Sequence, residues 1–310
     1  MRKSLVAALV TAVTAVLSVG PGTPATAASE FCARTAPNSS ILFYRELTGA
    51  AVTGTLEAGR WQQKAALTLP DGYTSAAVSR DSLLLWDAFS GKGESGTFTE
   101  GKYTRVKAFD DDALDGWHSV TASGDSVVLG ELSGDGVVMG SLKNGVYQQV
   151  RDYGDIGEDW WLVGSSCDTM VIVESTEETA GDFRFSLTYG TLQNGVYTQV
   201  GSRDEDAYLS DLVAMNGDLI ATKDSVMAAF SETKTEFVSK VGTATDGKVS
   251  ALRDGGSSAR FETVSRTADS VIFYKAGGTA RTATLSGGQF AAVGPLAGMA
   301  QGWGMIAGGV

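Results

Sequence analysis

The sequence predicts an all-β protein built from repeated four-stranded units, and three observations lead to this prediction. Glycine supplies 39 of the 310 residues and proline only 5, a balance that suits many tight turns between strands. A motif of the form Gly-x-Leu-x-x-Gly-x-aromatic returns along the whole chain. A second motif, an aromatic residue followed eight places later by Asp-Ser or Asp-Thr, lies upstream of most copies of the first.

The first motif has the chemistry of a β-hairpin. Asn144-Gly145 and Asn194-Gly195 are the favoured pair for a type I′ turn, in which both residues need a positive φ. We therefore expect the motif to form the last two strands of each unit. Its copies span residues 54–61, 96–103, 140–147 and 190–197, with weaker copies at 242–249 and 283–290. The corresponding turns of the other copies are 58–59, 100–101, 246–247 and 287–288.

The second motif predicts the first two strands of each unit, because each copy reads as a strand, a polar turn and an apolar strand. In the fifth unit we expect Tyr208 to be followed by Asp218, a copy that is two residues longer and lacks the hydroxyl. Four strands in about 40 to 52 residues is the spacing of a propeller blade. The regular copies are Tyr73 with Asp81-Ser82, Trp117 with Asp125-Ser126, Trp160 with Asp168-Thr169, and Phe261 with Asp269-Ser270.

The two ends of the chain predict how the units are arranged. Residues 38–44 resemble a second strand without a first, and residues 302–307 resemble a first strand with nothing after it. Joined, the two ends complete one more unit at the normal repeat distance. This predicts a six-bladed β-propeller over residues 38–310, closed by a C-terminal strand that joins the N-terminal blade. Closure of the ring leaves no long unpaired strand edge.

On these motifs the chain resembles the six-bladed β-propeller superfamily over nearly all of residues 38–310. The resemblance is one of architecture. The units contain no recurring Trp-Asp dipeptide, no paired glycines of the kelch type and no S-x-D-x-G-x-T-W box of the sialidases. It therefore implies a fold and carries over no functional residue.

The N-terminal residues predict export. Arg2 and Lys3 give a short positive start, residues 5–19 are apolar, and small residues at 25–28 suit cleavage by signal peptidase. The alternative, a membrane anchor, needs about 20 apolar residues and no cleavage motif. We expect a signal peptide over residues 1–28, an N-terminal extension over residues 29–37, and a secreted, extracellular mature protein.

The charge of the chain narrows the choice of partners. The formal net charge is −12, and it becomes −14 without the two positive charges of the leader. Such a surface repels nucleic acid and anionic lipid. We expect no nucleic-acid partner, no membrane insertion after cleavage, a monomer and no cofactor. Calcium could bind among loop acids, although the sequence contains no D-x-[DN]-x-[DN]-G loop.

Acidic residues gather in the loops that join successive blades. These loops lie on the same face of the ring as the loops between the second and third strands of each blade. We name this face the top face. Solvated loops of an acidic protein are one explanation for the acids, and a surface for a cation or a basic partner is the other. The candidates for binding among them are Asp110, Asp111, Asp112 and Asp159.

Aromatic residues open the predicted first strands, and they have two interpretations. Exposed rings would stack on sugars, whereas rings repeated at a strict period would pack between neighbouring blades. His118 and Trp161 break the repeat and are therefore better candidates for binding, together with their neighbours Trp117 and Trp160. The repeated set is Tyr73, Trp117, Trp160, Tyr208, Phe261 and Trp303.

The sequence favours binding over catalysis. The chain has one histidine, which excludes a multi-histidine metal centre and would force a Ser–His–Asp triad to use His118. A glycosidase needs two carboxylates facing one sugar ring, and the predicted first strands offer only Asp211 and Glu262. The leading hypothesis is a secreted, non-catalytic module that binds a glycan or a protein through the top face. The alternatives are a glycan-directed propeller hydrolase with carboxylates at the channel mouth, and a structural or envelope scaffold.

The two cysteines, Cys32 and Cys167, predict a disulfide, since thiols outside the cytoplasm are readily oxidised. Cys167 precedes Asp168 in a turn on the bottom face, opposite the top face, and Asn38 starts a strand at the same face. Six extended residues reach about 20 Å, which could carry Cys32 to Cys167. The alternative is a free, buried Cys167.

Overall fold

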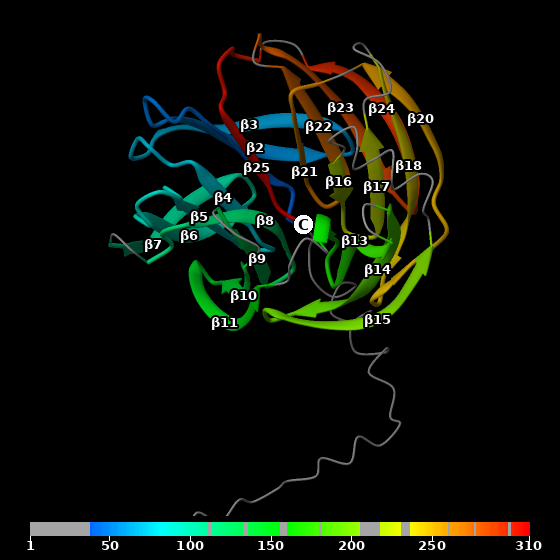
Figure 1. Ribbon diagram of the computed structural model, residues 1–310. Helices are drawn as coiled ribbons and strands as arrows, with labels where there is room; N and C mark the ends of the chain where they lie inside the picture. Colours follow the sequence, from blue (N-terminus) through cyan, green and yellow to red (C-terminus); the bar gives the residue numbers. More distant parts are fainter. Residues whose placement is uncertain are drawn as a thin grey trace, which may run out of the picture.

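The computed structural model describes ten stretches of the chain between Asn38 and Val310. The described residues form strands and turns and contain no helix. Six antiparallel sheets surround a common centre (Figure 1). The predicted all-β, six-bladed β-propeller is therefore confirmed. The described stretches are 38–110, 113–132, 136–155, 160–179, 182–204, 218–230, 236–259, 261–275, 277–296 and 299–310.

Each blade is one sheet whose strands follow one another outward from the centre of the ring. Blade I contains β25 (Met305–Gly308), β1 (Ser40–Tyr44), β2 (Ala50–Glu57) and β3 (Arg60–Thr68). Blade II contains β4 (Ser75–Val78), β5 (Ser82–Trp86), β6 (Gly93–Thr99) and β7 (Lys102–Phe109). Blade III contains β8 (Trp117–Ser123), β9 (Ser126–Glu131), β10 (Gly136–Lys143) and β11 (Val146–Asp155). Blade IV contains β12 (Trp160–Ser165), β13 (Thr169–Thr179), β14 (Asp182–Gln193) and β15 (Val196–Asp204). In blade V, β16 (Asp218–Ala221) and β17 (Ser225–Phe230) are followed by β18 (Glu236–Thr245), which pairs with both β19 (Lys248–Val249) and β20 (Arg253–Ala259). Blade VI contains β21 (Thr263–Arg266), β22 (Ser270–Lys275), β23 (Thr279–Ser286) and β24 (Gln289–Leu296).

The last strand of the chain closes the ring. β25 pairs antiparallel with β1, with Leu42 opposite Ala307 and Tyr44 opposite Met305. In Figure 1, β25 is drawn in red and lies beside the blue strands of blade I, and the C-terminus lies near the centre of the ring. The two ends of the described chain therefore share one sheet, as the repeat predicted.

The hairpins that end each unit turn through two residues with positive φ. Asn144 and Gly145 have φ values of 51° and 75°, and Asn194 and Gly195 have values of 49° and 75°. These values confirm the predicted type I′ turns, which require positive φ at both positions. The pairs at 58–59, 100–101, 246–247 and 287–288 also have positive φ at both residues.

In blade V the first strand lies later in the chain than predicted. The expected pairing of Tyr208 with Asp218 is wrong, because Asp218 is the first residue of the inner strand β16. Tyr208 itself lies outside the described residues. The Asp-Ser copy of this blade is Asp224-Ser225, at the start of β17. The sequence motif did not identify this copy, because no aromatic residue lies eight places before Asp224 and the connection before blade V is longer than the others.

The two sequence motifs meet at every boundary between blades. The hydroxyl that follows the motif's aspartate accepts a hydrogen bond from the N–H of the turn glycine in the next blade; in blade I this hydroxyl is that of Ser40, which follows Ser39 in place of an aspartate. The last of these bonds joins blade VI to blade I, so the six bonds form a closed ring. The O···N pairs, 2.7–2.9 Å apart, are Ser40–Gly101, Ser82–Gly145, Ser126–Gly195, Thr169–Gly247, Ser225–Gly288 and Ser270–Gly59.

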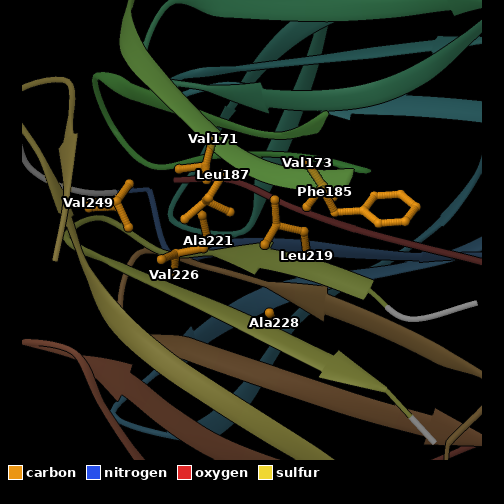
Figure 2. Close-up of a cluster of buried hydrophobic side chains, with 10 residues drawn as sticks. Val171, Val173, Phe185, Leu187, Leu219, Ala221, Val226, Ala228 and Val249 are labelled. Atoms are coloured by element: carbon orange, nitrogen blue, oxygen red, sulfur yellow. The ribbon is translucent and has the colours of Figure 1, made fainter. Parts of the chain in front are cut away.

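The hydrophobic core lies between the blades. Figure 2 shows one boundary, where Val171, Val173 and Leu187 of blade IV face Leu219 and Val226 of blade V. Equivalent clusters of buried side chains fill the other five boundaries. Each sheet therefore buries both of its faces, and burial of apolar surface holds the ring together from both sides of every blade.

Candidate functional site

Several of the predicted site residues cannot be placed. The inner strand of blade V, as described, begins at Asp218, and Asp211 precedes it in the sequence. The structure describes only the backbone of Trp160 and Trp161, which belongs to β12. The residues that lie outside the described stretches are Asp111, Asp112, Asp159, Asp211 and Cys32.

Trp161 interrupts the pairing of its strand. In β12, Trp160 lies opposite Glu174 and Leu162 lies opposite Val173. Trp161 is thus the extra residue of a β-bulge, a feature that often redirects a side chain near a functional site. The residue that breaks the sequence repeat also breaks the strand register.

The repeated aromatic side chains that are described pack between blades. Tyr73 and Trp303 are only 5% and 7% exposed. The Tyr73 ring lies 5.9 Å from the ring of Tyr44, a residue of the preceding blade. Trp117 packs against the cluster around Trp86, whose indole N–H donates to the Trp117 carbonyl at 2.7 Å. These rings therefore join neighbouring blades, and Tyr73 and Trp303 offer no open face to a sugar.

His118 faces the neighbouring strand of its own blade. It lies on β8 opposite Gly130 of β9, and a Cβ on Gly130 would lie 3.0 Å from the imidazole Cε1. The ring thus occupies the space that the missing side chain leaves. Burial lowers the pKa of His118, and its buried Nδ1 has no hydrogen-bond partner. A neutral imidazole is therefore favoured at neutral pH.

Three further predicted residues can be placed, and Glu262 lies just before the first strand of its blade instead of within it. Asp110 is exposed directly after β7, on the top face. Glu262 is exposed one residue before β21, and its N–H donates to the Tyr274 carbonyl at 3.0 Å. Cys167 is buried in the bottom-face turn between β12 and β13, and it is not a free cysteine.

The described stretches contain neither a cluster of metal-binding side chains nor a helix that could span a membrane. No group of three or more histidine, cysteine, aspartate or glutamate side chains there is arranged to hold a metal ion. Within the same stretches, no helix is long and apolar enough to cross a membrane.

Three apolar side chains stand exposed on the top face of blades I to III. Leu47 is 90% exposed, Phe89 74% and Leu132 46%. Each follows the second strand of its blade, in the connections β1–β2, β5–β6 and β9–β10. All three lie in loops of the same face of the ring. We name these three residues the apolar tips; they lie outside both sequence motifs, which is why motif analysis did not select them.

Hydrogen bonds hold the loop that carries Phe89. The Phe89 N–H donates to the Asp87 carboxylate at 3.1 Å, and the Asp87 N–H donates to the Lys92 carbonyl at 2.9 Å. At Gly91, φ is +71° and a Cβ would lie 2.5 Å from the backbone nitrogen of Asp115. Glycine is therefore required where the loop meets its neighbour. Phe89 is displayed on a loop that is already ordered.

The loops of blades I and II are joined by hydrogen bonds. The Gly72 N–H donates to the carbonyl of Glu46, the residue before Leu47, at 2.9 Å. Two residues after Gly72, the Thr74 hydroxyl accepts from the N–H of Ala88, the residue before Phe89, at 2.8 Å. The loops of two successive blades therefore form one connected surface.

Gly116 extends this surface to blade III. Its N–H donates to the Ala88 carbonyl at 2.8 Å, and its carbonyl accepts from the Leu132 N–H at 2.7 Å. The three apolar tips thus lie along one hydrogen-bonded arc of loops.

Acidic side chains accompany the apolar tips. Arg45 is half-buried, with its guanidinium carbon 4.6 Å from the ring centre of Trp303, and its Nη2 donates to the Gln301 carbonyl. Lys92 is the exposed basic residue of the described arc. The arc therefore carries net negative charge. Its exposed acids are Glu46, Asp71, Asp110 and Asp115.

Comparison with known proteins identifies the fold. No protein-family model matches the chain, and no curated protein matches its sequence. A provisionally assigned 6-phosphogluconolactonase from Bacteroides uniformis shares the fold with a TM-score of 0.51 and 10% identity, covering 86% of this chain and 98% of that one. A protein of unknown function from Desulfotomaculum acetoxidans gives a TM-score of 0.48 and 10% identity over 88% and 86% of the two chains. A chain of the nidogen/laminin complex gives 0.47 and 8% over 87% and 97%. At these identities the likeness concerns the fold alone.

Proposed function

We propose that this protein is a secreted, non-catalytic binding module that takes a partner protein through the apolar tips of its top face. The observation that carries the proposal is Phe89, which is 74% exposed on a loop held by hydrogen bonds. An aromatic side chain buries roughly 150–250 Å² when a partner covers it. A loop that is ordered in advance loses little conformational entropy on binding.

The apolar and acidic side chains of the arc indicate which kind of partner surface would complement it. Leu47 and Leu132 are further exposed apolar side chains on the two blades next to Phe89, and Asp71 and Asp115 are exposed acids of the same arc. Interfaces commonly combine an apolar centre with a charged rim. The partner is therefore a protein with an apolar pocket and basic residues around it, and the opposite charges speed the encounter.

A glycan is the second candidate, and the described side chains support it less. A sugar site needs an open aromatic face with polar groups beside it. Tyr73 and Trp303 are covered by neighbouring blades. Two of the three apolar tips are aliphatic, which favours an apolar protein pocket over a hydrated sugar.

Photo-cross-linking tests the proposal. Phe89 is replaced by p-benzoylphenylalanine, and the mature protein is irradiated with the proteins secreted by the cells that produce it. We expect discrete adducts that are competed by the unmodified protein and not by its Phe89→Ser variant. The matched control carries the photoreactive residue at Val196, which is exposed on the outer strand β15.

Two results would overturn the protein-binding proposal. Equal adducts from positions 89 and 196 would show that cross-linking reports exposure alone. Phe89-dependent binding on a glycan array, without any protein adduct, would show that the ligand of this site is a glycan and not a protein.

A further inference from the structure

A cavity of about 310 Å³ lies at the centre of the ring. The inner strands of blades I, II, III, V and VI contribute to its wall, and the surface that the wall exposes to the cavity is more polar than apolar. Ligand pockets measure about 300–1,000 Å³, so the cavity is large enough for a small molecule. The polar side chains in the wall are Ser119, Thr121, Asp218, Ser265 and Arg266.

Arg266 reaches across this cavity. It is the last residue of β21 in blade VI, and its Nη2 donates to acceptors in blades III and IV. The acceptors are the Thr121 hydroxyl at 3.1 Å, the Ala122 carbonyl at 2.9 Å and the Ser165 carbonyl at 3.1 Å. The guanidinium is therefore held in place, and all three of its acceptors are neutral.

The positive charge of Arg266 lacks a negative partner among the described residues. Its Nε is buried and has no hydrogen-bond acceptor. Burial lowers the pKa of Arg266 to about 10, which still leaves the side chain charged at neutral pH. Asp218 lines the same cavity but starts its inner strand, whereas Arg266 ends its own. A partly buried charge without a negative partner is costly, so an anion from solution would stabilise this site.

We propose that the central cavity binds a small monocarboxylate through the Arg266 guanidinium. Guanidinium groups bind carboxylates through charge-assisted hydrogen bonds. A carboxylate can accept two such bonds through its two oxygens, which a chloride ion cannot. A dianion would place its second negative charge in a cavity that already contains Asp218. This site is separate from the apolar tips, so either proposal can fail without the other.

Calorimetry and thermal unfolding in a chloride-free buffer test the site, with propionate as the probe. We expect saturable binding of propionate with an increase in melting temperature. Propionamide, which has the same shape without the charge, should give neither effect. Saturable binding of propionamide or of chloride as strong as that of propionate would overturn the monocarboxylate assignment.

Two variants and one control locate the site. Arg266→Met should weaken propionate binding by at least about tenfold, the loss expected when a charge-assisted hydrogen bond is removed. Ser119→Leu keeps Arg266 but fills the cavity, and it should abolish binding. Arg60→Met, at an exposed position on β3, should bind as the unmodified protein does. Unchanged affinity in Ser119→Leu would overturn the proposal even if Arg266→Met fails to fold.

Discussion

Two tyrosines at the same place in the repeat have opposite environments. The Tyr103 hydroxyl donates to the Glu94 carboxylate at 2.9 Å, and Arg105 lies 3.3 Å from the other carboxylate oxygen. The Tyr147 hydroxyl is buried without a partner, and burial raises the pKa of Tyr147 to about 12. The same side chain therefore stabilises blade II through its hydroxyl and carries an unpaired polar group in blade III.

We predict opposite effects for removal of these two hydroxyls. Tyr147→Phe should raise the free energy of unfolding by about 1 kcal/mol, because it removes a buried group that lost its water without gaining a partner. Tyr103→Phe should lower it by about 2 kcal/mol, because the buried Glu94 carboxylate loses a donor. Denaturant unfolding of both variants measures the difference. An equal decrease in the free energy of unfolding of the two variants would contradict the assignment of an unpaired Tyr147 hydroxyl and a paired Tyr103 hydroxyl.

Arg266 differs from the residues at the equivalent position of the other five blades. The position opposite the first apolar residue of each second strand is small or apolar in the other five blades: Val78, Ala122, Ser165, Ala221 and Gly308. Arg266 therefore breaks the repeat as His118 and Trp161 do, and the sequence alone contains this signal. The destination of its guanidinium was not predictable, because its acceptors lie 101 to 145 residues away in the chain.

At the scale of elements, the boundary between blades depends on one hydrogen bond repeated six times. Ser126 and Gly195 illustrate it: the glycine N–H donates to the serine hydroxyl at 2.9 Å, and the contact is buried. The type I′ turn directs this N–H toward the preceding blade. The same dipeptides thus make the hairpin and the contact between blades.

Loss of one such hydroxyl should be measurable. We predict that Ser126→Ala lowers the free energy of unfolding by about 1–2 kcal/mol, because the Gly195 N–H is left buried without an acceptor. Thr104→Ala, at an exposed position on β7, serves as the control and should change it by less than about 0.5 kcal/mol. A loss no larger than that of the control would show that the ring of hydrogen bonds contributes nothing to stability.

Local motifs predicted the elements better than the connections. The Asn-Gly turns and the Asp-Ser dipeptides were identified because each depends on neighbouring residues. Their pairing was not predicted, since Ser126 and Gly195 are 69 residues apart. The first strand of blade V was predicted too early, because more residues separate β15 from β16 than separate the corresponding strands of the other blades. The apolar tips were missed because exposure of a loop residue such as Phe89 depends on the folded ring.

At the scale of the whole molecule, the two cysteines would connect the N-terminal extension to blade IV. Cys167 is not free, and Cys32 is the other cysteine of the chain. We predict a Cys32–Cys167 disulfide, which mass spectrometry of the unreduced mature protein would detect as a linked peptide. Because the bond would close a long loop, Cys32→Ser should lower the free energy of unfolding by about 2–4 kcal/mol. Labelling of both thiols without reduction would contradict the bond.

The ring itself depends on a four-residue strand at the end of the chain. β25 supplies the inner strand of blade I, and Trp303 and Ile306 complete the cluster between blades I and VI. Every other blade is continuous in sequence. The top-face arc and the central cavity both require this closure, because β25 lines the cavity and blade I carries Leu47.

Deletion of residues 303–310 tests closure most directly, with thermal unfolding and hydrogen exchange of the β1 amides as the measurements. The truncated protein should melt at least about 10 °C below the complete mature protein, because the loss of Trp303 and Ile306 leaves apolar surface and the β1 edge uncovered. The β1 amides should exchange faster in the truncated protein. An unchanged melting temperature with equally protected β1 amides would contradict the closed six-bladed ring.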